Sequence, residues 1–204
     1  GLYVVSSKSA DGKECGCVIN TFTQVTAEPV QAIIAVHKDN VTTGAILESG
    51  LFAVTPFTQQ ADMKLIGRFG FRSSRDIEKF DGVASSVDQN GIRYLTECTA
   101  ACYSCRVVNK IDVGTHYLFV ASIENAEILS SDEVMTYAYY HAVKKGLTPP
   151  KASSYQPKQA SKPAAPVEGK KKTFRCDVCG YTVEADNLPA DYVCPVCKKG
   201  REHF

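Results

Sequence analysis

The chain has 204 residues, with 23 Lys and Arg against 22 Asp and Glu, no Trp, 9 Pro and 9 Cys. The near-zero net charge argues against a strongly basic nucleic-acid binder, and no run of about 18 apolar residues predicts a membrane span. The composition, 44% apolar and 22% charged, is typical of a globular protein. An odd number of cysteines fits poorly with a closed set of disulfides, so their placement is more informative than their number.

Strand-like segments dominate residues 1–155. In chain order, strands are expected over 2–6, 17–25, 30–36, 51–55, 93–108 and 115–129. Helices are expected over 41–49, ending at Gly50, from Thr58 through Phe69, and after the capping box Ser130-x-x-Glu133 up to Lys145. Asp11-Gly12 predicts a hairpin turn, 109–114 a second turn, and the apolar run 30–36 a strand buried on both faces. Many strands without a βαβ rhythm predict a mainly β fold, an antiparallel barrel with a few flanking helices.

A low-complexity segment over 156–172 separates this part from the rest of the chain. It contains five Lys, one Glu and three Pro, and Val167 is its one large apolar residue. Such a segment cannot bury enough apolar surface to offset its ordering entropy, so a flexible linker is expected. The segment has a net charge of +4, whereas residues 1–155 have a net charge of −2 and residues 173–204 one of −1. A nucleic-acid or membrane arm is the alternative, but the segment has no aromatic side chain to stack on bases.

The last part, 173–204, contains two C-x-x-C motifs separated by fourteen residues: Cys176, Cys179, Cys194 and Cys197. Each motif presents two thiolates, and two motifs complete a tetrahedral site for one zinc or iron ion. A stretch this short cannot build an adequate core, which favours a metal as the stabilising element. Two disulfides are the alternative, typical of a secreted domain.

The residues around these cysteines narrow the choice of metal. Cys176-Asp-Val-Cys179-Gly180-Tyr181 and the segment from Leu188 through Cys197, with Pro189, Asp191 and Pro195, resemble rubredoxin. The resemblance implies one redox iron bound by all four cysteines. The spacer is shorter than in ordinary rubredoxins, and Tyr192 stands where Trp is usual. Gly180 suits a positive φ after the first motif.

Residues 1–155 contain no G-x-G-x-x-G after a strand, no P-loop and no G-x-S-x-G. They do contain two polar segments, 20–26 and 38–43, rich in Thr, Asn and Gln. Hydroxyls, amides and a helix N-terminus can bind a phosphate without a basic cluster. Threonine-rich strands are also ordinary β structure, so these segments alone do not assign a ligand.

A series of segments in this part follows one another in a recognisable order. They are Gly1–Val5, Asp11-Gly12, Cys15–Pro29, Lys38–Thr43, Phe71–Phe80, Gly114–Val120 and Gly146–Pro150. Together they resemble the flavin-reductase-like, flavoredoxin-type FMN-binding split barrels. Here Glu28-Pro29 stands where many members have two prolines, and Ser74 replaces a frequent glycine.

This resemblance implies a homodimer with one FMN per subunit in a groove near the dimer interface. It places Cys17, Val18, Ile19, Asn20 and Thr21 along the flavin, with Asn20 and Thr21 near the ribityl chain or phosphate. The implied phosphate contacts are Lys38, Thr42, Thr43 and Arg75. The resemblance assigns no catalytic side chain.

The remaining cysteines and two histidines allow further readings. Cys98, Cys102 and Cys105 could suggest a second metal site, but they fall within an expected strand and lack a fourth ligand, which favours buried thiols. Cys15 and Cys17 share a strand face, and Cys17 is either a redox-active thiol or a small packing residue. His37 and His116 are candidate proton donors or structural hydrogen-bonding groups.

Combining the two parts predicts an oxidoreductase that carries electrons. Flavin-reductase-like domains joined to rubredoxin resemble the high-molecular-weight rubredoxins of anaerobic bacteria. That resemblance implies NAD(P)H as donor and a flavodiiron oxygen or nitric oxide reductase as acceptor. Reduced thiols beside a rubredoxin-like site favour the cytoplasm, and the charge and hydropathy predict neither nucleic acid nor membrane as partner. The alternatives are a passive carrier reduced by a separate enzyme, and a flavin reductase that releases reduced FMN and uses a zinc ribbon for docking.

Overall fold

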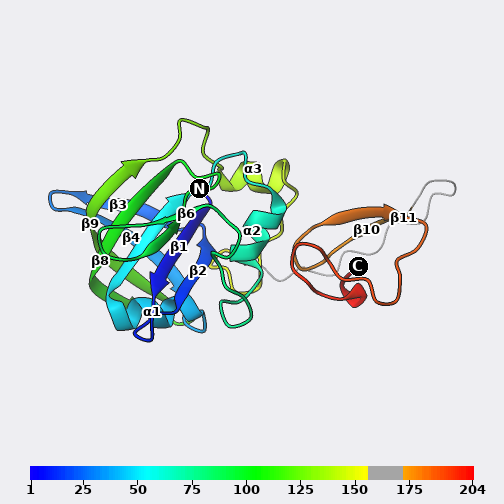
Figure 1. Cartoon of the computed structure of the whole chain (residues 1–204), viewed down its shortest axis with the longest axis horizontal. Helices are drawn as coiled ribbons and strands as arrows, with labels where there is room; N and C mark the ends of the chain where they lie inside the picture. Colours follow the sequence, from blue (N-terminus) through cyan, green and yellow to red (C-terminus); the bar gives the residue numbers. More distant parts are fainter. Residues whose placement is uncertain (156–171) are drawn as a thin grey trace.

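The computed structural model describes residues 1–155 and 172–204. The first range folds into a strand-rich domain and the second into a small domain with two short strands (Figure 1). The predicted linker over 156–172 lies outside the described residues, apart from Lys172, where a strand of the small domain begins. None of the described helices is both long and apolar enough to cross a membrane.

The larger domain is built on one seven-stranded sheet. Its strands are β1 (Tyr3–Lys8), β2 (Glu14–Ile19), β3 (Phe22–Ala27), β4 (Val30–His37), β5 (Leu51–Pro56), β8 (Ala101–Asp112) and β9 (His116–Ile128). They follow the order β2-β1-β5-β8-β9-β4-β3, and each neighbouring pair is antiparallel. A small hairpin of β6 (Ser85–Val87) and β7 (Arg93–Leu95) forms a separate two-stranded sheet that packs on the large one through Tyr94.

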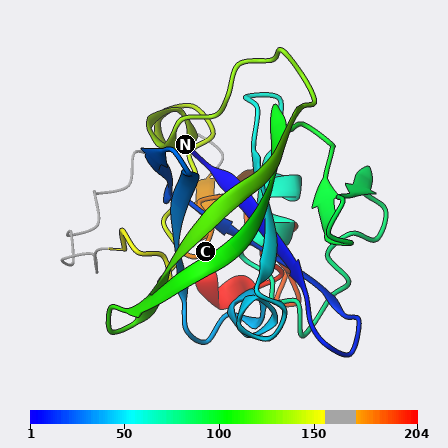
Figure 2. The same ribbon diagram turned by 90° about the vertical axis from the view of Figure 1, so that its left-hand side faces the viewer.

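The sheet curls, so that strands distant in its order face a common core (Figure 2). Val5 from β1, Ile34 from β4, Val54 from β5 and Phe119 from β9 belong to one buried cluster. Helix α1 (Val41–Ser49) covers this core through Ile46 and ends at Gly50 with a φ of 67°, as predicted. The predicted mainly β, antiparallel split-barrel class is confirmed.

Three strand predictions need correction. The expected strand 17–25 is two strands, because the chain breaks at Asn20 and Thr21 between β2 and β3. The expected strand 93–108 is likewise two, β7 and β8, and β8 continues through most of the predicted turn 109–114. Strand β4 alternates between buried and half-buried residues, so one face packs on the core and the prediction of burial on both faces is wrong.

Two helices begin later than predicted, and the same contact explains both. Thr58 forms an isolated β-bridge with Val134, so neither residue can lie in a helix. Helix α2 (Met63–Gly70) is therefore capped by Asp62, whose carboxylate accepts from Leu65 N at 2.7 Å. Helix α3 (Tyr137–Ala142) is capped by Thr136 rather than by Ser130.

A buried lysine fastens the loop that follows α2. Lys79 is only 1% exposed, and its Nζ donates to the carbonyl oxygens of Arg68 and Arg72. In return, the Arg68 guanidinium donates to the carbonyl oxygens of Lys79 and Asp81 at 2.9 and 2.5 Å. These bonds hold the loop against α2, which gives the helix a fixed position at the edge of the domain.

Lys79 predicts a measurable pH dependence of stability. Burial lowers its pKa from 10.5 to about 8. Between these values the folded state releases a proton that the unfolded state keeps, so the free energy of unfolding rises with pH. Between pH 8 and 10.5 we expect the free energy of unfolding of the wild type to rise by about 3 kcal/mol relative to that of Lys79→Met. Urea unfolding followed by circular dichroism at several pH values measures this difference, and a constant difference would contradict the prediction.

The small domain consists of the hairpin β10 (Lys172–Arg175) and β11 (Thr182–Ala185), two cysteine-bearing turns and the 3₁₀ turn η1 (Arg201–His203). Its core contains the four cysteines and Val196, with Tyr181 and Phe204 packed against them. Gly180 has a φ of 82°, as expected for the residue after the first C-x-x-C motif. This core is too small to hold 33 residues in place without a metal ion.

Candidate functional site

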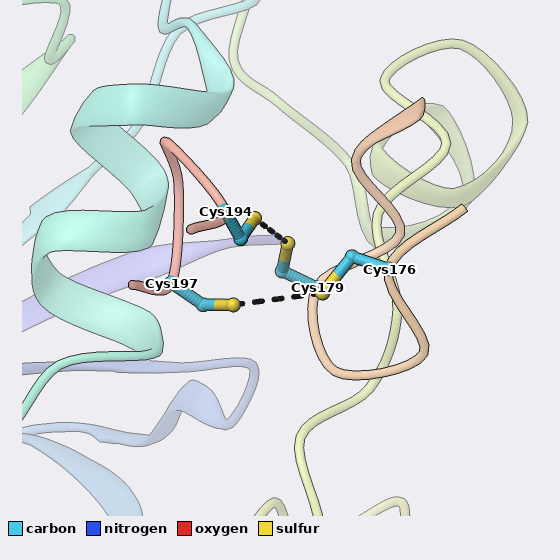
Figure 3. Close-up of side chains that lie close together, drawn as sticks. All are labelled: Cys176, Cys179, Cys194 and Cys197. Carbon is cyan, nitrogen blue, oxygen red and sulfur yellow. Dashed lines mark hydrogen bonds between the residues drawn. The ribbon is translucent and has the colours of Figure 1, made fainter. Parts of the chain in front are cut away.

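Cys176, Cys179, Cys194 and Cys197 converge from the two turns on one point (Figure 3). Their sulfurs all lie within 4.8 Å of one another, and all four residues are buried. Cys176 Sγ lies 3.6 Å from Cys197 Sγ, and Cys179 Sγ lies 3.5 Å from Cys194 Sγ. A disulfide requires about 2.05 Å, so these distances contradict the disulfide alternative. Tetrahedral metal–sulfur bonds of about 2.3 Å would place neighbouring sulfurs about 3.8 Å apart, which fits.

Burial and backbone hydrogen bonds act in opposite directions on these thiols. Burial raises the pKa of Cys197 to about 12 and also raises the pKa of Cys179, whereas at Cys194 burial is outweighed by hydrogen bonds from the backbone of Cys197 and Val196, which lower the pKa. Without a cation, four buried thiolates would repel one another. A bound metal ion takes the place of the thiol protons, and its positive charge offsets this repulsion. The donor set therefore suits one tetrahedral ion with four sulfur ligands.

A pocket lies on the larger domain where β2, β4, α2 and α3 approach one another. Its cavity volume is about 60 Å³, within a wider hollow of about 590 Å³ that includes open solvent. The predicted flavin contacts Cys17, Val18, Ile19 and Asn20 all line it. Apolar side chains form one wall, and a polar end is formed by His37, Asn40, His116, Lys151 and Ser153. An apolar wall for a ring system and a polar end for a phosphate are the features that a flavin mononucleotide requires.

The other predicted flavin contacts do not line this pocket. Lys38 pairs with Asp112 at 2.5 Å, and the Thr43 hydroxyl donates to His37 O at 2.8 Å. Thr21 Oγ1 bridges the Ala35 backbone, accepting from its nitrogen at 3.2 Å. Arg75 is exposed, and Thr42 is buried; among the described residues, Thr42 Oγ1 has no hydrogen-bond partner. As phosphate or flavin contacts, these residues stay predictions.

Several lining residues from distant segments were not predicted as flavin contacts: His37 and His116 were singled out only as candidate proton donors or hydrogen-bonding groups, and Lys151 was not singled out. His37 and His116 meet with ring centroids 5.0 Å apart, and burial together with His37 lowers the pKa of His116. Lys151 comes from the segment after Pro149-Pro150. Of the two family-like segments nearby, 114–120 contains His116 and 146–150 directly precedes Lys151, but neither segment indicated which side chain faces the pocket.

The segment after α3 closes one side of the pocket. The Asn20 amide donates to Ser154 Oγ at 2.8 Å, and Ser153 Oγ donates to Asn20 Oδ1 at 3.0 Å. Tyr137 Oη, on α3, lies 2.9 Å from Thr148 Oγ1. These hydrogen bonds therefore fix the side chain of Asn20, at the break between β2 and β3, against the C-terminal segment of the larger domain.

The remaining cysteines do not form a second metal site within residues 1–155 and 172–204, where the four described above are the one cysteine cluster that could hold an ion. Cys102 and Cys105 lie buried in β8, and burial raises the pKa of each to about 12. Burial also raises the pKa of Cys17 to about 11. A thiol with this pKa stays protonated at neutral pH, which favours the packing role over the redox-active one.

Comparison with known proteins gives the family. The model of the flavin reductase like domain matches residues 1–148, and the rubrerythrin, rubredoxin-like domain matches residues 174–204. The chain belongs to the flavin reductase-like family. Its C-terminal part is a rubredoxin-like domain with four cysteines suited to one iron, and the flavin reductase-like fold binds FMN or FAD, so both cofactor predictions are confirmed.

Two relatives cover most of the chain. The ferric-chelate reductase (NAD(P)H) of Archaeoglobus fulgidus is 45% identical over 155 residues, which are 76% of this chain and 91% of the relative. The high molecular weight rubredoxin of Moorella thermoacetica is 32% identical over 219 aligned residues, covering 100% of this chain and 94% of the relative. The second comparison confirms the resemblance to the high-molecular-weight rubredoxins.

Solved structures agree on the fold of the larger domain. An NADH:FAD oxidoreductase of Streptomyces globisporus C-1027 superposes with a TM-score of 0.59 at 23% identity, covering 66% of this chain and 79% of its own. The flavoredoxin of Methanosarcina acetivorans gives a TM-score of 0.56 at 21% identity, covering 61% and 66%. At this identity the likeness shows the fold.

Proposed function

We propose that this flavin reductase-like protein oxidises NAD(P)H at an FMN in the larger domain and passes the electrons singly to an iron in the rubredoxin-like domain. The observation that carries the proposal is one chain with both a flavin-type pocket and a four-cysteine centre. The likeness to an NAD(P)H-dependent reductase over the first domain supports the donor.

The two cofactors divide the chemistry between them. When bound, FMN accepts two electrons as a hydride and releases them one at a time. The four cysteines hold iron as a one-electron centre, and their burial keeps water from its ligands. On the protein side, Val18 and Ile19 are apolar lining residues suited to the ring, and the histidines at the polar end are suited to the phosphate. Lys151 also lines this end, but it would have to exchange its partner Asp39, whose Oδ2 lies 3.3 Å from Lys151 Nζ, to bind the phosphate.

We propose a separate one-electron acceptor protein for the reduced iron, of the flavodiiron oxygen or nitric oxide reductase type. The full-length likeness to a high molecular weight rubredoxin supports a carrier role. The homodimer and the cytoplasmic location also stay predictions. Exposed apolar side chains in the second half of β8, Val108 and Ile111, suit a dimer contact, whereas the exposed Ile128 lies at the opposite end of the β8–β9 pair.

Anaerobic stopped-flow spectroscopy of the iron- and FMN-loaded protein tests this function. We expect NADH or NADPH to bleach the flavin band first and the ferric band second. Flavin-free protein should show no bleaching of the iron, because the nucleotide delivers a hydride and iron accepts one electron. If neither centre is reduced, the protein is a passive carrier supplied by another enzyme. Metal analysis that finds zinc would favour the free-flavin reductase alternative.

A further inference from the structure

We propose that the α2 face formed by Met63, Gly67 and Phe71 is the docking surface on which the iron domain receives electrons, with Phe71 and Tyr140 as the wall between the two centres. The inference rests on the proposed function and adds the place of the transfer. Figure 3 shows the loop that carries Cys194 and Cys197 running alongside α2.

The second cysteine turn packs directly on this helix. At Gly67, a Cβ would lie 2.5 Å from Val196 Cγ1 and 3.1 Å from Val196 O, so only glycine allows this approach. Val196 lies between Cys194 and Cys197 and is only 4% exposed. Met63 and Phe71 pack against the cysteine cluster from the same side. Contacts this close are characteristic of a specific interface, and beside them an open hollow of about 390 Å³ lies between α2 and the turn that carries Pro195, Val196 and Lys198.

The first cysteine turn contacts a different segment of the larger domain. Arg175 Nη2 donates to Lys145 O at 3.2 Å. A Cβ at Gly180 would collide with that same carbonyl and would lie 3.1 Å from Leu147 Cγ. Lys145 has a φ of 57°, an uncommon conformation outside glycine that turns the chain toward the small domain. Both cysteine turns therefore rest on the larger domain, one on α2 and one beyond α3.

The surface that receives the iron domain is also a wall of the flavin pocket. Ile66, Gly70, Phe71 and Tyr140 line that pocket. Phe71 belongs to both sites, since it also packs against the cysteine cluster. Tyr140 Oη donates to Leu147 O at 3.0 Å, which connects the pocket lining to the segment that contacts Gly180. A single layer of side chains thus separates the pocket from the four cysteines.

This arrangement gives a balanced electron transfer. Each docking event moves one electron from reduced flavin to ferric iron, which becomes ferrous. One hydride supplies two such events, the proton left by the hydride goes to solvent, and a one-electron acceptor protein reoxidises the iron between them.

The variant Gly67→Ala tests the surface in the full chain. Gly67 does not line the pocket, and alanine favours the helix, but its Cβ would collide with Val196. Gly44→Ala in α1 is the matched control, because a Cβ there meets nothing within 4 Å. In the FMN- and iron-loaded protein, we expect Gly67→Ala to slow bleaching of the ferric band about tenfold or more while flavin reduction keeps its rate.

A second readout does not depend on activity. In zinc-loaded, flavin-free protein, ¹⁵N relaxation should show residues 172–204 tumbling with the larger domain in the wild type and in Gly44→Ala, and faster in Gly67→Ala. Independent tumbling in the wild type, or a Gly67→Ala protein that matches the wild type in both readouts, would overturn the proposal. If NAD(P)H does not reduce the wild-type flavin, the proposed function fails, and the relaxation data still decide whether α2 is the docking surface.

Discussion

Cys179→Ser is expected to unfold residues 172–204 and to remove the metal from the protein. The core of this domain consists of the four cysteines, Val196 and a few partly buried aromatic side chains. In comparable small domains, metal binding supplies about 10–16 kcal/mol of apparent folding free energy. A serine hydroxyl is a poor replacement for a thiolate ligand, so we expect most of this energy to be lost.

Metal analysis and the amide NMR spectrum measure the outcome. Cys98→Ser is the control, because Cys98 is a half-buried thiol of the larger domain, outside the four-cysteine site. The control should retain one metal ion per chain. In Cys179→Ser, the signals of the larger domain should keep their positions while those of 172–204 collapse to random-coil values. A native spectrum with one bound ion would contradict the assignment.

Ala35→Phe is expected to lower the affinity for FMN about hundredfold, which corresponds to about 2.7 kcal/mol. Ala35 lies on β4 and lines the pocket, beside Val36 and His37. It belongs to the half-buried face of the strand, so a phenyl ring there would fill the pocket without entering the main core. The fold should therefore survive the substitution.

Ile33→Phe provides the matched control for this variant. Ile33 is on the same face of β4, two residues away, but it does not line the pocket. Fluorescence titration with FMN measures both affinities, and circular dichroism confirms that both proteins fold. Loss of binding in Ile33→Phe together with normal binding in Ala35→Phe would show that flavin binds elsewhere.

The sequence was sufficient for the metal centre because its ligands are set by local spacing. Each C-x-x-C motif forms its own turn, and the structure brings the four sulfurs together as the pattern indicated. The predicted flavin contacts from Cys17 to Asn20, at the end of β2 and just after it, line one pocket, since a contiguous segment can be placed once its fold family is recognised.

The contacts that could not be predicted depend on distant segments. Lys38, a predicted phosphate contact, pairs in the structure with Asp112, 74 residues away, and the sequence could not indicate this pairing. Thr58 and Ser130 are both good helix caps by residue type, but the β-bridge between Thr58 and Val134 moves both helix starts downstream. Tertiary pairing thus overrides local capping preference, and a single sequence does not reveal such pairings.

The position of Phe71 has a thermodynamic consequence. Its ring lines the pocket and also packs against the cysteine cluster, so the two occupants share one side chain. If flavin binding and docking each favour a particular arrangement of that ring, then bound flavin changes the docking equilibrium of the iron domain. Linkage makes the effect reciprocal: a domain held on α2 would alter flavin affinity by the same factor, and the metal in the small domain would become a regulator of flavin loading.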